Sequence, residues 1–215
     1  KIQKINHLSY CLGNLRQYIY KLKMNHLILA SSSKYRIELL SRLNIPFESK
    51  SPEIDEELIK NQIKNPIELV EKLSILKAKK IYKNYPSATI IGSDQIICLD
   101  QTIFDKPLSL ENAILQLKKL SGNIHSLITA VTIINKKQTV TFHNITLLKM
   151  RDLTIQEIEF YVEQDKPLDC AGSYKVESLG ISLFDSIDTS DFTSIVGLPL
   201  IQLTSNLKSL GFKIP

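Results

Sequence analysis

The sequence predicts an α/β protein, and three observations carry that prediction. Apolar, strand-like segments alternate along the chain with segments of helical periodicity that have recognisable caps. No internal repeat and no low-complexity linker interrupts this alternation. The 215 residues, 43% of them hydrophobic and 23% charged, suffice for one large domain or two small lobes that share a cleft. Disordered and fibrous architectures are therefore excluded.

The first predicted element is a strand over residues 26–30, which runs into Ser31-Ser32-Ser33 and then into a helix over 36–43. A strand that meets a helix through a serine-rich turn suits phosphate, because backbone N–H groups at a helix N-terminus bind anions. Residues 1–23 carry five basic side chains and no acid. We interpret them as an N-terminal extension of a domain over 24–215 that begins at Met24, with a targeting segment as the alternative.

The next helix is predicted to begin at Asn65 and to run to about Tyr82. Asn65 is a good N-cap, Pro66 suits the first helical position, and Glu68 stands where a capping box places an acid. Lys77 occupies one place in an otherwise apolar row of this helix. Its ammonium either snorkels to solvent or meets a specific partner, and the helix alone favours the first.

Residues 88–99 read as two strand segments joined across Gly92-Ser93-Asp94-Gln95. Asp94 stands between two β-branched runs, where a buried carboxylate needs a partner, a metal or an opening into a cleft. Gly92 would allow a close backbone approach at the same point. An Asx-turn within a hairpin is an equally good interpretation of this fragment.

The rest of the chain continues the alternation. A helix is predicted between its cap at Ser109 and its end at Gly122, followed by a hairpin of strands 125–134 and 139–148. The next helix opens with a capping box at Thr154 and stops before Pro167. A strand over 180–187 and a last helix from Pro199 to about Gly211 complete the chain.

Two sets of charged residues are candidates for phosphate chemistry. The acidic run over 52–57 is either a solvated loop or a source of a carboxylate, from Asp55 or Glu56, that joins Asp94 in holding Mg²⁺ or Mn²⁺. Arg36, Lys77 and Lys106 are isolated cations in apolar settings. A polyphosphate site needs such a combination of cations, a carboxylate pair and serine hydroxyls.

Composition and motifs argue against several other classes of protein. No apolar run approaches the ~20 residues of a membrane helix, and three cysteines without a CxxC motif indicate a reduced, cytoplasmic chain with no membrane partner. The net charge of +5 and the pI near 9.0 would suit a polyanion. The cations are dispersed, however, and no aromatic-rich basic strand is present, so no nucleic-acid partner is expected.

Taken together, these motifs resemble the Maf family of nucleotide pyrophosphatases, in unbroken order from about residue 27 to 212. The matching blocks are 27–40 (LILASSSKYRIELL), 52–56 (PEIDE), 76–78 (LKA), 91–95 (IGSDQ), 105–107 (DKP), 120–122 (LSG), 170–174 (CAGSY) and 196–200 (VGLPL).

The resemblance implies an elongated mixed β-sheet flanked by helices, with two lobes around a central cleft. It implies hydrolysis of a nucleoside triphosphate to the monophosphate and pyrophosphate with a divalent cation (Mg, Mn or Co), and it is compatible with a homodimer. The implied site residues are Asp94 as general base and metal ligand, Asp55 as the second metal ligand, and Ser31, Arg36, Lys77 and Lys106 as phosphate-binding groups. Departures from the family pattern are Lys34 for a usual proline, Ile37 for a common second arginine, and Asp105 for a common glycine.

Three positions that separate branches of the family carry Tyr35, Gln95 and Glu177. The branch that acts on dTTP and UTP has arginine, threonine and glutamine there, whereas the set here is similar to the branch that acts on 7-methyl-GTP. A tyrosine face attracts a methylated, cationic guanine, and a carboxylate accepts from guanine N–H groups. Alternatively, Tyr35 packs on the first helix and Glu177 lies in a surface loop.

The expected function is thus hydrolysis of 7-methyl-GTP, which would remove a modified nucleotide from the pool. Three alternatives remain open: the same chemistry on dTTP, UTP or another modified nucleotide, a nucleic-acid-binding module, and a non-enzymatic nucleotide-binding regulator of cell division.

Overall fold

The computed structural model describes residues 26–215. The predicted extension over residues 1–23 and the start at Met24 lie outside the described residues. Strands and helices alternate as expected, and seven strands form one sheet with the order β2-β1-β3-β5-β6-β7 and β4 paired to β3. The strands are β1 (Leu27–Ala30), β2 (Glu48–Ser49), β3 (Thr89–Leu99), β4 (Thr102–Phe104), β5 (Ile124–Ile134), β6 (Thr139–Met150) and β7 (Phe184–Asp188).

The helices connect and cover these strands. They are α2 (Lys34–Ser41), α3 (Glu56–Gln62), α4 (Pro66–Tyr82), α5 (Leu110–Leu120), α6 (Ile155–Asp165) and α7 (Leu200–Ser209), with 3₁₀ turns η1 (Ala171–Ser173), η2 (Leu179–Leu183) and η3 (Phe192–Val196). β1 pairs in parallel with β2 and β3, and the other pairs are antiparallel. The sheet is therefore mixed, as the sequence led us to expect.

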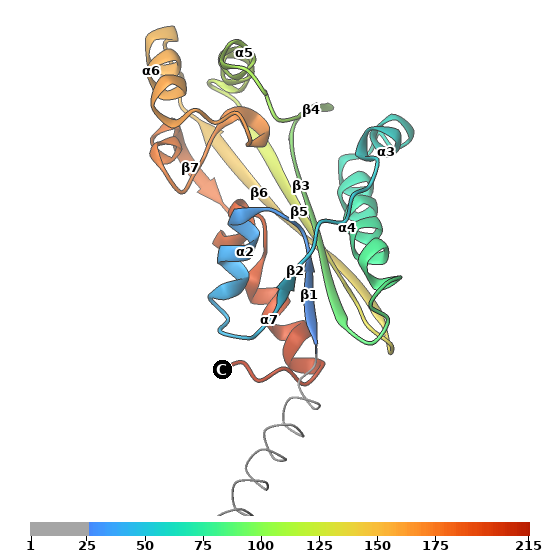
Figure 1. The fold of residues 1–215 in the computed structure, drawn as a ribbon. Helices are drawn as coiled ribbons and strands as arrows, with labels where there is room; N and C mark the ends of the chain where they lie inside the picture. The colour runs from blue at the N-terminus through green and yellow to red at the C-terminus, as the bar shows by residue number, and fades with distance from the viewer. Residues whose placement is uncertain (1–25) are drawn as a thin grey trace, which may run out of the picture.

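The alternation of side chains in β1 separates two layers of helices. Leu27 and Leu29 pack with α2 and α7, whereas Ile28 and Ala30 pack with α4. Figure 1 shows the result, with α4 along one side of the sheet and α2 and α7 on the other. α5 and α6 lie together at the far end of the long strands.

Each end of the long strand β3 belongs to a different hydrophobic cluster. Ile91 packs in the cluster of β1, α2 and α7, and Ile97 packs in the cluster of α5 and α6. The strand thus passes from one lobe to the other, and its middle residues lie between two cores. This arrangement matches the expected two lobes with a cleft between them.

Local sequence signals account for several helix starts. Asn65 accepts hydrogen bonds from the backbone N–H groups of Ile67 and Glu68, and Ser109 accepts one from Asn112. Thr154 forms the full capping box with Glu157. The hairpin of β5 and β6 is also confirmed.

Two predicted elements need correction. Residues 89–99 form one unbroken strand, so the turn across 92–95, and with it the Asx-turn interpretation of Asp94, is wrong. The predicted strand over 180–187 is also wrong in its first half, because Leu179–Leu183 forms a 3₁₀ turn and β7 begins at Phe184. Main-chain contact with Lys175 at Gly180 leaves no room for a side chain there.

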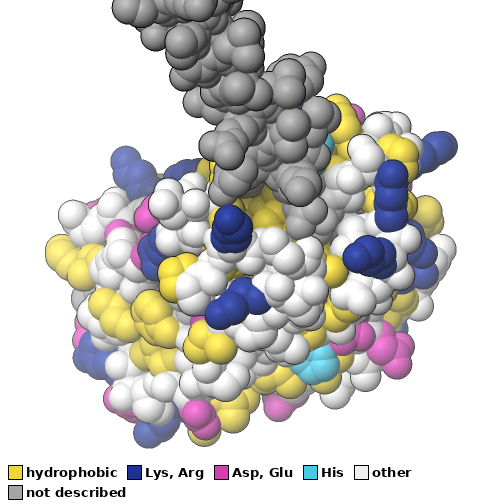
Figure 2. Space-filling model, turned by 90° about the horizontal axis from the view of Figure 1, so that it is seen from below, with side chains coloured by type: hydrophobic (Ala, Val, Ile, Leu, Met, Phe, Trp, Pro, Cys, Tyr) yellow, Lys and Arg dark blue, Asp and Glu magenta, His cyan; other side chains and the backbone are white. Residues whose placement is uncertain are grey.

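One face of the molecule carries its charges in a dispersed pattern. On the face seen in Figure 2, lysine and arginine side chains lie singly between apolar, acidic and other groups. Within residues 26–215, no helix combines the length and apolar character that crossing a bilayer requires.

Candidate active site

Asp94 lies in the middle of β3, between the two lobes, and the residue is 6% exposed. Two residues earlier, Gly92 faces α4 so closely that an added Cβ would lie 2.3 Å from the carbonyl oxygen of Ser74. Only glycine permits this approach without displacing the helix. The close packing brings the next turn of α4, and with it Lys77, to the carboxylate of Asp94.

Lys77 is the centre of a buried ionic cluster. Its Nζ lies 2.5 Å from Asp94 Oδ1 and 2.8 Å from Glu56 Oε1 at the start of α3. The residue is only 8% exposed, so the snorkelling interpretation of Lys77 is wrong. Two carboxylates around one ammonium satisfy a charge that would be costly to bury alone.

Burial and charge oppose each other at these carboxylates. Burial raises the pKa of Asp94 above its usual value, although the nearby charges of Lys77 and Arg36 act to lower it. Burial also acts to raise the pKa of Glu56, but Lys77, Lys60 and Arg36 together outweigh it and the pKa of Glu56 is lowered. Asp94 is therefore the better proton acceptor of the two.

Arg36 reaches the same cluster from α2, on the opposite side of the sheet. Ser33 caps that helix by accepting a hydrogen bond from the backbone N–H of Arg36. The guanidinium Nε donates to the carbonyl oxygen of Gly197 at 3.1 Å, which fixes the side chain. Arg36 lines the cleft together with Asp94 and Lys77.

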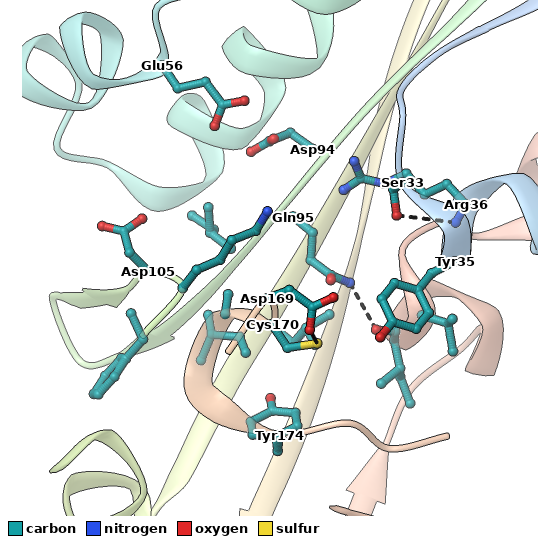
Figure 3. A pocket seen from close by; sticks show the side chains of 18 of the residues that line it. Ser33, Tyr35, Arg36, Glu56, Asp94, Gln95, Asp105, Asp169, Cys170 and Tyr174 are labelled. Carbon is teal, nitrogen blue, oxygen red and sulfur yellow. Dashed lines mark hydrogen bonds between the residues drawn. The ribbon is translucent and has the colours of Figure 1, made fainter. Parts of the chain in front are cut away.

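The cleft contains two cavities that adjoin at their shared walls. One, of about 430 Å³, reaches into the lobe of α5 and α6, and the other, of about 490 Å³, lies over the serine turn. Their shared lining residues are Ser33, Tyr35, Arg36, Glu56, Lys77, Lys106 and Asp169. Figure 3 shows Glu56 and Asp94 on one side of the first cavity and Tyr35, Cys170 and Tyr174 on the other.

Most of the predicted site residues line this cleft. Tyr35, Gln95 and Glu177 line the first cavity, and Ser31 lines the second. The backbone N–H of Ser33 donates to the Ser31 hydroxyl oxygen at 3.1 Å. Tyr35 does not simply pack on its helix, because it lines both cavities. Burial, together with the nearby Cys170, Asp169 and Glu177, raises the pKa of its phenol.

Asp55 lies elsewhere. It is the N-cap of α3, where Oδ1 accepts a hydrogen bond from the backbone N–H of Leu58 at 3.1 Å, and it lines neither cavity. Glu56, the next residue, takes the place beside Lys77. An aspartate followed by two glutamates and a leucine is typical of a helix start, and this signal could have separated the cap from the site residue.

Two further cleft residues carry no recognisable signal in the sequence. Asp169 lines both cavities, and Lys60 on α3 bonds Asp105 at 2.6 Å, which ties α3 to the loop that carries Lys106. Both residues lie in segments whose position depends on tertiary packing.

Residues 26–210 match the model of the family described as Maf-like protein. The chain belongs to the Maf family. It is 44% identical over 183 residues to a 7-methyl-GTP pyrophosphatase of Bdellovibrio bacteriovorus, covering 85% of this chain and 96% of that protein. It is 46% identical over 195 residues to a 7-methyl-GTP pyrophosphatase of Pseudomonas aeruginosa, covering 89% of this chain and 100% of that protein.

Among solved structures, this Maf chain aligns with the Staphylococcus aureus Ham1 protein over 86% of its own length and 99% of the other chain. The TM-score is 0.48 and the sequence identity is 14%, so the likeness is distant.

Proposed function

We propose that this protein hydrolyses 7-methyl-GTP to 7-methyl-GMP and pyrophosphate. The observation that carries the proposal is the buried Lys77–Asp94 pair, 2.5 Å apart, where the two cavities meet. We call the cavity over the serine turn the phosphate-facing cavity and the one that reaches into the lobe of α5 and α6 the base-facing cavity. The names of the relatives support the same substrate. A metabolic role in removing the modified nucleotide follows from that activity.

Asp94 is the proton acceptor. Lys77 occupies its Oδ1, while Oδ2 is bonded by no group of residues 26–215 and is not sealed from solvent. A water held at Oδ2 attacks the α-phosphorus, its proton passes to Asp94, and the bond from that phosphorus to the bridging oxygen breaks as pyrophosphate leaves. The raised pKa of Asp94 makes the carboxylate a stronger base than an exposed aspartate.

The cations stabilise the phosphate charges in this reaction. Lys77, Arg36 and Lys106 all line both cavities, so each can face the triphosphate from a different element. They offset the negative charge that grows on the leaving pyrophosphate. Ser31 lines the phosphate-facing cavity with Ser32 and Ser33 at the N-terminus of α2, where hydroxyl and backbone N–H groups can bind phosphate oxygens.

The donor set fits a hard divalent cation. Asp94 and Glu56 offer carboxylate oxygens, and Mg²⁺ in nucleotide enzymes is held by one or two carboxylates together with substrate phosphates. Residues 26–215 hold no cluster of three or more His, Cys, Asp or Glu side chains that could bind a metal by themselves. Mg²⁺, Mn²⁺ or Co²⁺ bound there would neutralise phosphate charge. Asp55 as a further ligand stays a prediction.

Tyr35 and Glu177 would recognise the base. The methylated guanine carries a positive ring that the face of Tyr35 attracts, and the carboxylate of Glu177 would accept from its N1–H and 2-amino groups. Pyrimidines offer neither the ring charge nor this pair of donors.

A nucleotide panel tests the function directly. Purified protein is assayed with 7-methyl-GTP, GTP, UTP and dTTP in Mg²⁺, Mn²⁺ or Co²⁺, and the products are identified by mass. We expect the highest kcat/KM for 7-methyl-GTP. Faster cleavage of UTP or dTTP would move the protein to the other branch of the family, and nucleotide binding without cleavage would favour a regulator.

The variant Glu177→Gln tests base recognition. Loss of one charge-assisted hydrogen bond should lower the ratio of kcat/KM for 7-methyl-GTP over UTP about tenfold. Glu159→Gln, an exposed change on α6, is the matched control and should leave the ratio unchanged. Equal ratios for both variants would remove Glu177 from the base site.

A further inference from the structure

A chain of buried polar groups leads from the wall of the base-facing cavity into the sheet. Gln95 on β3 lies directly opposite Thr129 on β5, and Thr129 is completely buried. Gln95 Nε2 lies 2.8 Å from Thr129 Oγ1, 2.9 Å from the Ser194 carbonyl oxygen and 3.1 Å from the Ile195 carbonyl oxygen.

All three neighbours of this amide group are acceptors. Two are backbone carbonyl oxygens, and the Thr129 hydroxyl donates its own hydrogen to the Ser194 carbonyl oxygen at 2.9 Å. An amide oxygen in this place would face two carbonyl oxygens that have no hydrogen to donate. The amide orientation of Gln95 is therefore fixed by chemistry, with the NH₂ group inward.

The amide oxygen of Gln95 is consequently left to accept a hydrogen bond from a group in the cavity. No donor among residues 26–215 bonds to Gln95 Oε1, and this atom is not among the sealed, unpartnered polar atoms of the described chain. Gln95 lines the base-facing cavity with Glu177. The wall thus presents acceptors from two side chains that come from distant parts of the sequence.

We propose that Thr129 is a positioning residue for substrate specificity: it holds the Gln95 amide so that Oε1 accepts an N–H from the base. This inference rests on the proposed function and deepens it. A carboxylate that accepts from N1–H and from one hydrogen of the 2-amino group leaves the second hydrogen of that group pointing away from it, free for another acceptor. Hypoxanthine lacks that group, so a fixed acceptor at Gln95 selects guanine over hypoxanthine.

The test compares kcat/KM for 7-methyl-GTP and 7-methyl-ITP, which differ only in the 2-amino group. Thr129→Val keeps the side-chain shape and removes the hydroxyl, so we expect the ratio of the two constants to fall about tenfold. Thr129→Ser keeps the hydroxyl and should retain the wild-type ratio. In a Gln95→Ala background, Thr129→Val should cause no further change, and Thr129→Ala serves if the valine variant does not fold.

A merely structural role predicts a different pattern, in which the hydroxyl-free variants lower kcat/KM for both nucleotides equally and the ratio stays constant. That pattern would overturn the inference and leave the proposed function intact. Failure of the wild-type protein to hydrolyse either nucleotide would overturn the proposed function and the inference with it.

Discussion

At the scale of single residues, Lys77 affects both the orientation and the pKa of the acidic groups in the site. Its ammonium bonds both Asp94 and Glu56, and Lys77 and Asp94 are buried. Breaking such a group by removing one partner leaves an uncompensated buried charge. Lys77 therefore has two effects: it orients Asp94, the proposed proton acceptor, and it keeps the pKa of Asp94 from rising further.

The variant Lys77→Met retains the length of the side chain and removes its charge. We expect kcat/KM to fall at least ~100-fold, since one electrostatic donor to a transition state contributes on the order of 10²–10³ in rate. The pKa of Asp94 should rise, so the acid limb of the pH profile moves to higher pH. Lys80→Met, exposed on the same helix, is the matched control. An acid limb that stays in place would show that Asp94 does not set it.

His125 makes folding stability depend on pH. Burial lowers the pKa of this histidine to about 4, and its Nδ1 has no partner in the described chain. The unfolded chain therefore binds the proton more tightly, and stability is lost as pH falls from about 6.5 towards 4. The full loss is roughly 3 kcal/mol. Chemical denaturation at several pH values measures it. In His125→Phe the dependence of the free energy of unfolding on pH should largely disappear over this range. An unchanged pH dependence would show that His125 does not cause it.

The sequence predicted the residue types of the site better than their pairing. Asp94 and Lys77 each break an apolar pattern, but that pattern left an Asx-turn open for Asp94 and favoured snorkelling for Lys77. The resemblance to the Maf family assigned both residues to the site. Their contact depends on how α4 crosses β3, which no local pattern encodes. The residues alone left Asp55 and Glu56 open as the second carboxylate, and the resemblance favoured Asp55, whereas the structure has Asp55 at the cap of α3 and Glu56 beside Lys77.

At the scale of elements, the packing of α4 on β3 positions the site. Gly92 lets the helix approach the strand so closely that Lys77 reaches Asp94. The sequence alone suggested a turn at this glycine, because glycine beside serine and aspartate is typical of turns. Pairing on both sides, with β1 and β5, overrides that local preference and keeps the strand straight through the glycine.

The variant Gly92→Ala tests this packing. The added Cβ would lie 2.3 Å from a backbone oxygen and 2.7 Å from a backbone nitrogen of α4, so the helix must move. Overpacking of this kind costs about 1–3 kcal/mol or more, and the shift withdraws Lys77. The free energy of unfolding, measured by urea denaturation, and kcat/KM should both fall. The exposed change Ser87→Ala should alter the free energy of unfolding by less than ~0.5 kcal/mol. Full activity in Gly92→Ala would contradict the account of the site.

Helix starts with side-chain caps could be predicted from the sequence. The bounds of strands, which depend on pairing with other strands, were harder to predict. The caps at Asn65, Ser109 and Thr154 are local hydrogen bonds that three or four residues specify. β7 begins later than predicted, because strand pairing to β6 and the 3₁₀ turn before it depend on distant segments.

At the scale of the whole molecule, two hydrophobic cores share long strands and leave a cleft between them. The alternation of elements predicted the fold class, and the resemblance to the Maf family added the mixed sheet and the cleft. The strand β3 contributes to both cores and carries Asp94 and Gln95 between them. The residues proposed for chemistry and for base selection are thus neighbours on one strand, and their side chains point to opposite faces of the sheet.

The most direct test is the rate of 7-methyl-GTP hydrolysis by Asp94→Asn, measured as kcat/KM beside the wild-type protein. The amide keeps the shape of the side chain and cannot accept the proton, so we predict a loss of about 10²–10⁴-fold. The thermal unfolding midpoint reports whether the variant stays folded. A folded Asp94→Asn protein that retains near wild-type turnover would contradict the assignment of Asp94 as the proton acceptor.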